Sequence, residues 1–139
     1  MIQRHRISIV LLASALCGCG RGTEPPPTTG ARQCVVGFYQ SLIAQDFEAA
    51  YAALDIGSQK RVGQQQFNQL ARSYRSNLGF EPETVAVRAC DEHDNEAMAQ
   101  IVVTGKVPNR RHKDALPLIR DDDGWHVVLP ANFGQVAGP

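Results

Sequence analysis

The sequence has no excess of charge of either sign. Its 139 residues include 14 basic and 14 acidic side chains, which gives a formal net charge of zero. Proteins that bind nucleic acid gather many basic side chains against the phosphate backbone. Here the only basic run is residues 110–113 (RRHK), which is short enough to be a solvated hairpin loop. The composition therefore gives no electrostatic reason to expect DNA or RNA as a partner.

A hydrophobic run long enough to cross a membrane is missing at the N-terminus. Residues 7–16 are apolar except for Ser8 and Ser14, whereas a transmembrane helix needs about twenty apolar residues. The run follows Arg4 and Arg6 and precedes small residues, which is the order of regions in a signal peptide. We therefore predict that residues 1–18 are a signal peptide that directs export.

Sequence signatures of catalysis and metal binding are absent as well. There is no glycine-rich phosphate loop, no nucleophile elbow and no Cys-His pair at a recognisable spacing. His93, His112 and His126 lack the close spacing of zinc ligands, and residues 121–123 lack the other ligands of a calcium loop. The residues by themselves predict no catalytic group, no metal and no cofactor.

What is present begins with two cysteines at the end of the N-terminal run. Leu16-Cys17-Gly18-Cys19 resembles the bacterial lipobox, in which a small residue precedes the cleavage site and a cysteine follows it. The resemblance implies that Cys19 carries the lipid; Cys17 fits less well, because Leu16 would then precede the cut. An ordinary secretory signal with incidental cysteines is the alternative. Several acyl chains on one cysteine hold a protein on a membrane almost permanently.

The residues after Cys19 indicate a destination and a tether. Gly20 stands where lipoproteins retained in the inner membrane often carry Asp, so in a Gram-negative host we expect the outer membrane, facing the periplasm. Residues 19–30 contain three consecutive prolines and no large apolar residue, which predicts an extended linker rather than packed structure. A proline-rich recognition motif is the alternative. The folded domain is predicted to span residues 31–133.

The domain begins with helical patterns. Apolar residues recur at spacings of three and four over residues 31–45, which predicts a helix with one apolar face. Asp46 is placed to cap a short second helix over residues 47–54, and Ser58 could begin a further helical turn. A third helix is predicted through Phe67 and Leu78, with Gly79 just beyond its end.

After Pro82 the hydrophobic period changes from helical to two. Residues 85–90 and 99–104 predict a hairpin, and a third strand follows around Leu116 and Leu118, with Pro117 indicating an edge or a bulge. In the last strand Trp125 is expected to face the interior and meet Phe38 and Leu42 of the first helix. The fold class is therefore α+β, with three N-terminal helices packed on a curved, mainly four-stranded antiparallel sheet.

The order of these elements resembles a known superfamily. Residues 38–51 (FYQSLIAQDFEAAY) and the terminal DDDGWHVV are similar to the nuclear transport factor 2-like (NTF2-like) superfamily, which includes SnoaL-like and ketosteroid-isomerase-like cones. More narrowly, the chain resembles small bacterial lipoproteins of this superfamily that have no assigned activity. The resemblance covers about residues 31–130 and implies a cone fold. Because exposed sheets in the superfamily often pair, a homodimer is also expected.

The resemblance does not bring isomerase chemistry with it. Counting back from Asp46 places Phe38 where ketosteroid isomerase has its oxyanion-hole tyrosine, and Tyr39 is turned about 100° away around the helix. No carboxylate follows in residues 56–62, and Asp55 is better explained as a residue that caps or terminates a helix. We therefore expect a membrane-anchored, non-catalytic binding or interaction module. Its partner would be a small apolar ligand or an envelope protein.

An enzyme that uses the cone's cavity for acid/base chemistry on a small apolar molecule is the alternative. Its only plausible polar participants are Tyr39, Tyr51, Tyr74 and His126. For either function, the side chains expected to line the cavity are Phe38, Tyr39, Tyr51, Tyr74 and Trp125.

Two further cysteines lie in the predicted domain. Cys34 and Cys90 form an even pair in an oxidising compartment, so a disulfide could join the first helix to the sheet. Two partly buried thiols that behave as small apolar residues are the alternative.

Overall fold

The computed structural model describes residues 30–107 and 109–135, and the predicted signal peptide, Cys19 and nearly all of the tether lie outside these residues. Four helices come first: α1 (Gly30–Ala44), α2 (Phe47–Ala52), α3 (Ile56–Arg61) and α4 (Gln64–Asn77). Four strands follow: β1 (Pro82–His93), β2 (Glu96–Gly105), β3 (Arg111–Asp121) and β4 (Gly124–Val127). The predicted α+β class is confirmed, with α3 as a helix in addition to the three expected.

Local side-chain caps explain why the short helices begin where they do. The Asp46 carboxylate accepts a hydrogen bond from the Ala49 backbone N–H at 3.1 Å, which caps α2. Asp55 accepts from the backbone N–H groups of Gly57 and Ser58 at 3.0 and 3.2 Å, which caps α3. These bonds satisfy donors that the first helical turn leaves free. Asp55 is therefore a cap, as the sequence indicated.

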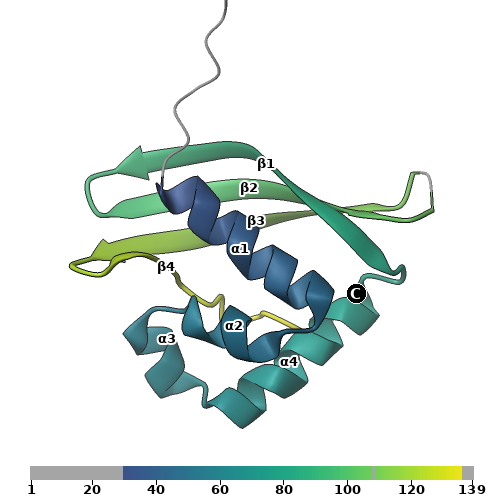
Figure 1. Ribbon diagram of the computed structural model, residues 1–139, viewed down its shortest axis with the longest axis horizontal. Coiled ribbons are helices and arrows are strands. Elements are labelled where there is room, and N and C mark those ends of the chain that lie inside the picture. The colour runs from purple at the N-terminus through teal and green to yellow at the C-terminus, as the bar shows by residue number, and fades with distance from the viewer. Residues whose placement is uncertain (1–29, 108, 136–139) are drawn as a thin grey trace, which may run out of the picture.

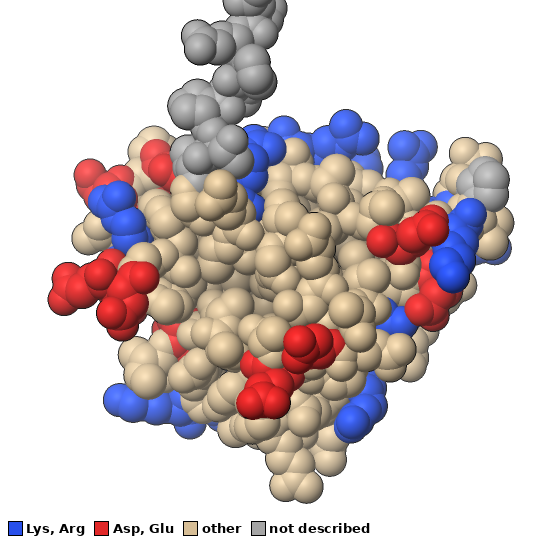
Figure 2. All heavy atoms as spheres, in the orientation of Figure 1, with Lys and Arg blue, Asp and Glu red and all other residues tan. Residues whose placement is uncertain are grey.

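The strands form one antiparallel sheet in the order β1-β2-β3-β4. α1 lies across one face of this sheet. α2 and α4 pack against α1, and all three later helices lie below it in the view of Figure 1. On this side of the molecule, charges of both signs lie mostly around the margin, with basic side chains along the upper edge of the view (Figure 2). Within the described residues, no helix is long and apolar enough to cross a membrane.

Pro117 lies in an interior strand, so the edge position that the sequence indicated is wrong. β3 pairs with both β2 and β4, and its pairing with β2 runs without a register shift past Pro117. The Pro117 carbonyl accepts a hydrogen bond from the backbone N–H of Val128, just beyond the end of β4. The nitrogen and the carbonyl of a strand residue point to the same side of the strand. The Pro117 nitrogen, which has no hydrogen to donate, therefore points toward the end of β4, and the hydrogen bonds between β2 and β3 are complete.

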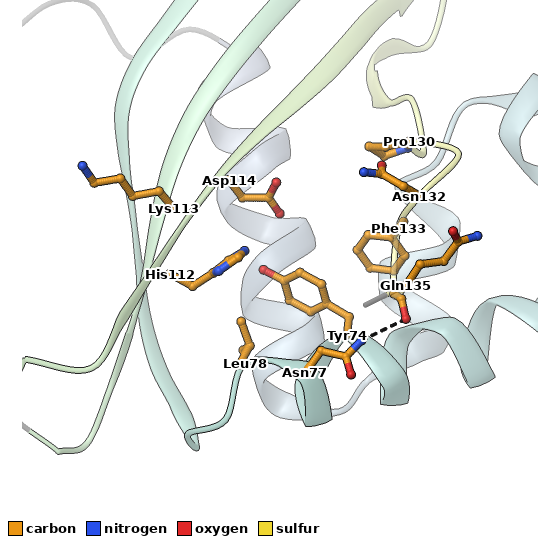
Figure 3. A pocket seen from close by; sticks show the side chains of 11 residues that line it. Tyr74, Asn77, Leu78, His112, Lys113, Asp114, Pro130, Asn132, Phe133 and Gln135 are labelled. Atoms are coloured by element: carbon orange, nitrogen blue, oxygen red, sulfur yellow. Dashed lines mark hydrogen bonds between the residues drawn. The ribbon is translucent and has the colours of Figure 1, made fainter. Parts of the chain in front are cut away.

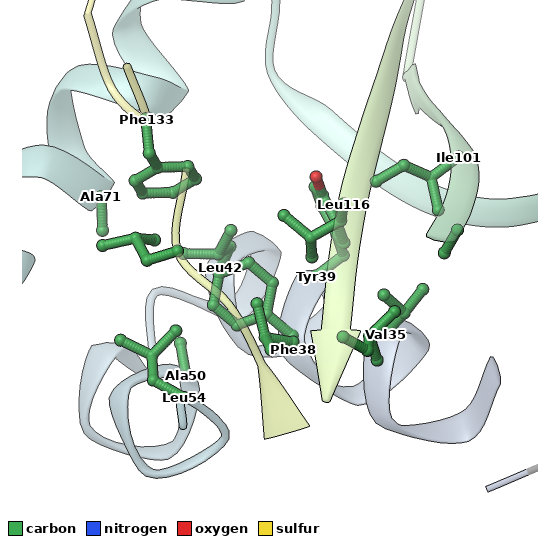
Figure 4. Packing of buried hydrophobic residues seen from close by; sticks show 14 of the residues in the cluster. Val35, Phe38, Tyr39, Leu42, Ala50, Leu54, Ala71, Ile101, Leu116 and Phe133 are labelled. Atoms are coloured by element: carbon green, nitrogen blue, oxygen red, sulfur yellow. The ribbon is translucent and has the colours of Figure 1, made fainter. Parts of the chain in front are cut away.

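The core surrounds α1, with side chains of the sheet on one side and of α2, α4 and the C-terminal segment on the other, as Figure 4 shows. Val35, Phe38, Tyr39 and Leu42 of α1 are fully buried, and Ile101 and Leu116 meet them from the sheet. This is the one-sided apolar face that the helical spacing predicted.

Trp125 lies at the margin of this core, not inside it. Val127 and Leu129 of the same row are buried, but Trp125 is only partly buried. Its ring lies close to Gly30 at the start of α1, and the Arg120 guanidinium lies 5.4 Å from the ring centroid. The predicted contact with Phe38 and Leu42 is therefore wrong, because β4 places Trp125 opposite the first turn of the helix instead of its middle.

Cys34 and Cys90 are free thiols in the structure, so the predicted disulfide is not formed there. Both side chains are partly buried and pack against the core. Burial raises the pKa of Cys34 to about 11. Burial, followed by the nearby Glu92 carboxylate, also raises the pKa of Cys90.

Candidate functional site

A pocket of about 630 Å³ opens between the end of α4, the start of β3 and the C-terminal segment 130–135. Figure 3 shows Tyr74 of α4 directed toward Asp114 and His112 of β3, with Phe133 beside the tyrosine ring. Asn77, Leu78, Lys113 and Gln135 are also among the lining residues. The wall therefore combines aromatic and aliphatic surface with a few polar groups, as small-molecule sites commonly do.

The aromatic side of the pocket is built by stacked rings. The Phe133 ring stacks on Tyr74 at a centroid distance of 5.0 Å and on Phe67 at 6.1 Å. The C-terminal segment is held in place by a 3.1 Å hydrogen bond from the Asn77 side-chain amide to the carbonyl of Gly134. The segment after the last strand thus supplies one wall of the pocket.

The polar side of the pocket comes from one face of β3. His112, Asp114, Leu116 and Leu118 alternate along this strand, and their exposure falls from the rim of the sheet to its interior. The Tyr39 hydroxyl donates a 2.8 Å hydrogen bond to Oδ2 of Asp114, and Oδ1 of Asp114 accepts from the Ala115 N–H at 2.9 Å. The carboxylate is therefore fixed in orientation from both sides.

The Tyr74 hydroxyl is the exceptional group of this site. Tyr74 is 8% exposed, and its hydroxyl oxygen is buried with no hydrogen-bond partner among the described residues. The side chains of Asp114 and Tyr39 lie close enough to the hydroxyl to shift its pKa, but neither makes a hydrogen bond of ordinary geometry with it. Burial, followed by the Asp114 charge, raises the pKa of Tyr74, and burial above all raises that of Tyr39. Both phenols therefore stay protonated near neutral pH.

An unpartnered buried hydroxyl carries a free-energy cost of about 1–3 kcal/mol. Native proteins satisfy almost all such groups, so an exception calls for a physical explanation. The hydroxyl oxygen is closed to solvent, so a molecule in the pocket reaches it only after a small shift of the wall. Such a molecule could accept a hydrogen bond from the Tyr74 hydroxyl and donate one to Asp114. Hydroxyl and amide groups can do both.

The structure separates the predicted cavity residues. Of Phe38, Tyr39, Tyr51, Tyr74 and Trp125, only Tyr74 lines the pocket. Phe38 and Tyr39 lie behind it in the core, where Tyr39 reaches Asp114. Trp125 is at the far margin of the core.

Tyr51 and His126, two of the four polar residues proposed for an enzyme, make interactions outside the pocket. The Tyr51 hydroxyl lies within hydrogen-bonding distance of the backbone carbonyls of Gln59 and Val62, at 3.0 and 3.1 Å. His126 pairs with Asp121 at 3.0 Å on the β3–β4 hairpin. Neither lines the pocket. Among the residues that the structure describes, no cluster of three or more His, Cys, Asp or Glu side chains could hold a metal ion.

The sequence prediction missed His112, Asp114 and Phe133. The basic run was expected to be a hairpin loop, but Arg111, His112 and Lys113 belong to β3. Extending the alternation of Leu116 and Leu118 backward by two steps would have placed Asp114 and His112 on the inner face. No comparable signal exists for Phe133, because the segment after β4 has no regular period.

Comparisons with known proteins identify the fold. A crystal structure from Campylobacter jejuni, named as a candidate NTF2-like transpeptidase, matches with a TM-score of 0.60 and 13% identity, over 70% of this chain and 96% of the other. The solution structure of a SEC-C motif containing protein from Rhodopseudomonas palustris matches with a TM-score of 0.55 and 12% identity, over 73% of this chain and 79% of the other. No family model and no curated protein matches the sequence. The chain has an NTF2-like fold.

Proposed function

We propose that this protein is a lipid-anchored, non-catalytic binding module of the cell envelope, which holds a small amphiphilic molecule in the Tyr74 pocket. The observation that carries the binding proposal is the buried, unpartnered Tyr74 hydroxyl in the wall of a pocket of about 630 Å³. The anchor rests on the sequence Leu16-Cys17-Gly18-Cys19, with the lipid on Cys19.

The pocket's chemistry favours a ligand that is largely apolar and carries one uncharged polar group. Phe133, Leu78 and the Tyr74 ring offer apolar surface, which a flat or aliphatic body would cover. The polar group would meet the Tyr74 hydroxyl and the Asp114 carboxylate together. A ligand carboxylate would be repelled by Asp114, which cannot act as a hydrogen-bond donor while ionised.

Co-purification with a matched pair of variants tests the proposal. The full chain is expressed in a Gram-negative host and isolated from the envelope, and small molecules released from it are identified by mass spectrometry. We expect the wild type and Tyr51→Phe to retain the same molecule, because the Tyr51 hydroxyl lies outside the pocket. Tyr74→Phe keeps the ring stacking but removes one hydrogen bond, so its affinity should fall about tenfold.

Three results would contradict the proposal. The first is equal retention by Tyr74→Phe and wild type, and the second is the absence of any bound molecule. The third is recovery of a chemically converted form of the molecule that requires Tyr74, which would favour the enzyme alternative.

A further inference from the structure

Basic side chains are concentrated at one end of the sheet. This end comprises residues 82–88 of β1 and residues 100–115, which include the β2–β3 turn. The carboxylates of these residues belong to Glu83 and Asp114, and Asp114 accepts a hydrogen bond from Tyr39. The cations outnumber them, and all are exposed: Arg88, Lys106, Arg110, Arg111 and Lys113. This end of the sheet is therefore locally positive, although the formal net charge of the whole chain is zero.

Three of these cations, Arg88, Arg111 and Lys113, line a shallow groove of about 620 Å³, which we call the basic groove. In Figure 3 the Lys113 side chain points away from Tyr74, toward the face of the sheet opposite the pocket. Arg111 lies on the same face as Lys113, because alternate residues of a strand share a face. Among the described residues, none of the three cations forms an ion pair. Their charges are therefore available to an anionic partner from outside the chain.

The acidic groups at the other end of this face, Asp91 and Glu96, are too distant to cancel the positive charge at physiological salt. Asp91 pairs with Met98 of β2, whereas Lys113 pairs with Val102. Met98 and Val102 are four positions apart, which is about 14 Å along a strand. The Debye length at 0.15 M salt is about 8 Å. A surface in front of the basic groove therefore meets a positive field.

The chain that leads to the predicted anchor enters the domain beside the basic groove. Arg32, in the first turn of α1, donates a 2.9 Å hydrogen bond to the carbonyl of Val87, which precedes Arg88. Residues 20–29 separate Cys19 from α1, and ten residues reach at most about 35 Å when fully extended. A lipid on Cys19 would therefore keep the groove close to the membrane, where contacts too weak to hold a free protein become effective.

We propose that the basic groove lies against the phosphate groups of anionic lipids in the membrane that carries the anchor. This inference rests on the proposed lipid on Cys19 and adds an orientation of the domain to it. Anionic headgroups match the groove because they form an extended layer of negative charge, and each cation near such a layer adds to the attraction. The Tyr74 pocket, on the opposite face of the sheet, then points away from the membrane.

Lysine labelling on vesicles tests this orientation. The lipid-carrying full chain is purified in a mild detergent and inserted into preformed vesicles of phosphatidylcholine, either alone or mixed at about two to one with phosphatidylglycerol. A membrane-impermeant amine reagent is added, and mass spectrometry of peptides gives the rate at each lysine. We expect the rate at Lys113 to be about fivefold lower on the anionic vesicles and to recover at high salt, which screens the attraction. Lys60 of α3, outside the groove, should react equally on both vesicles.

A matched pair of variants shows whether the groove itself causes the protection. Arg111→Gln removes one exposed cation of the groove, so it should weaken docking about fivefold and abolish most of the protection at Lys113. Arg72→Gln removes an exposed cation from α4, outside the groove, and should keep the protection of the wild type. Equal protection of Lys113 in the two variants would overturn the proposal.

Flotation of the vesicles separates failure of this inference from failure of the anchor. A chain that does not float with neutral vesicles has no lipid anchor, and that result would overturn both proposals. A chain that floats with both kinds of vesicle, but whose Lys113 reacts equally on them, would overturn the orientation alone. Equally strong protection of Lys113 on neutral and anionic vesicles belongs to this last case, because the cover would then not be anionic lipid.

Discussion

At the scale of single residues, Tyr74 combines a well-packed ring with an unsatisfied hydroxyl. In the free protein, removing that hydroxyl removes a buried polar group that has no partner. Tyr74→Phe should therefore raise the free energy of unfolding by about 1 kcal/mol while it weakens ligand binding. Urea unfolding followed by the fluorescence of the single tryptophan, Trp125, measures the change.

Tyr39→Phe is the matched control for that measurement. The Tyr39 hydroxyl donates a hydrogen bond to Asp114, so removal of this hydroxyl should lower the free energy of unfolding by about 1 kcal/mol. Opposite signs for the two variants are the expected signature. A loss of stability in Tyr74→Phe would show that the hydroxyl has a partner in solution.

Burial should make Cys34 less reactive than an exposed thiol. Only the thiolate reacts with iodoacetamide, and burial raises the pKa of Cys34 to about 11 from an ordinary value of 9.0. At pH 8 we expect Cys34 to be alkylated more slowly than in the unfolded chain, with a rate that keeps rising up to about pH 11. Peptide-resolved mass spectrometry follows each cysteine. Protection of both Cys34 and Cys90 that is lost on reduction would instead demonstrate the disulfide.

The same pKa difference has a consequence for stability. Between about pH 9 and pH 11 the folded state keeps the Cys34 proton that the unfolded chain has lost. Stability must therefore fall as the pH rises through this range.

At the scale of elements, the position of the C-terminal segment depends on the close packing of Gly134 against the backbone of α4. Gly134 has φ 73°, and a Cβ at this position would overlap the backbone carbonyl of Leu70. Gly134→Ala should destabilise the protein by about 2 kcal/mol or more and displace the Phe133 wall of the pocket. Urea unfolding gives the loss of stability.

Gly79→Ala separates strain from overlap in that experiment. Gly79 has a similar φ of 68°, but no atom lies within 4 Å of an added Cβ. Its substitution should therefore cost only the backbone strain, about 1 kcal/mol. Equal effects at the two glycines would mean that the segment 130–135 does not pack on α4 as described.

Trp125 of β4 contacts α1 at the edge of the core, so its truncation should lower the free energy of unfolding less than the truncation of a core residue. Trp125→Ala should cost about 1–2 kcal/mol, because the ring is only partly buried and part of its contact is with Arg120. Phe38→Ala, at a fully buried position, should cost about 3–5 kcal/mol. Thermal unfolding followed by circular dichroism compares them. A Trp125→Ala loss as large as that of Phe38→Ala would place the tryptophan in the core after all.

At the scale of the whole molecule, the proposed lipid on Cys19 would determine where the domain is held. Cys19→Ala removes the sulfur that would carry the acyl chains, so the precursor should remain unprocessed and take up no clickable fatty acid. Cys17→Ala should label as the wild type does. Label on the Cys19→Ala protein would refute the assignment.

Local patterns in the sequence predicted most elements of the domain, although α3 was expected only as a further helical turn and β3 as an edge or bulged strand. Helical spacing over residues 31–45 gave the buried face of α1, Asp46 and Asp55 were readable as helix caps, and period-two alternation after Pro82 gave the sheet. These features depend on interactions between residues that are only a few positions apart, so the spacing of residues in the sequence is enough to predict them.

Only the tertiary structure decided which side chains form the pocket and which lie at the margin. Tyr39, Tyr74 and Asp114 come from α1, α4 and β3, and Asp114 is 75 residues from its partner Tyr39. Phe133 reaches Tyr74 from an irregular segment whose path depends on Gly134 and Asn77. Trp125 shares the alternation of Val127, yet the offset of β4 against α1 leaves it near the first turn of the helix. Spacing along the chain determines the face on which a side chain lies, but the register and crossing of packed elements determine what that side chain meets.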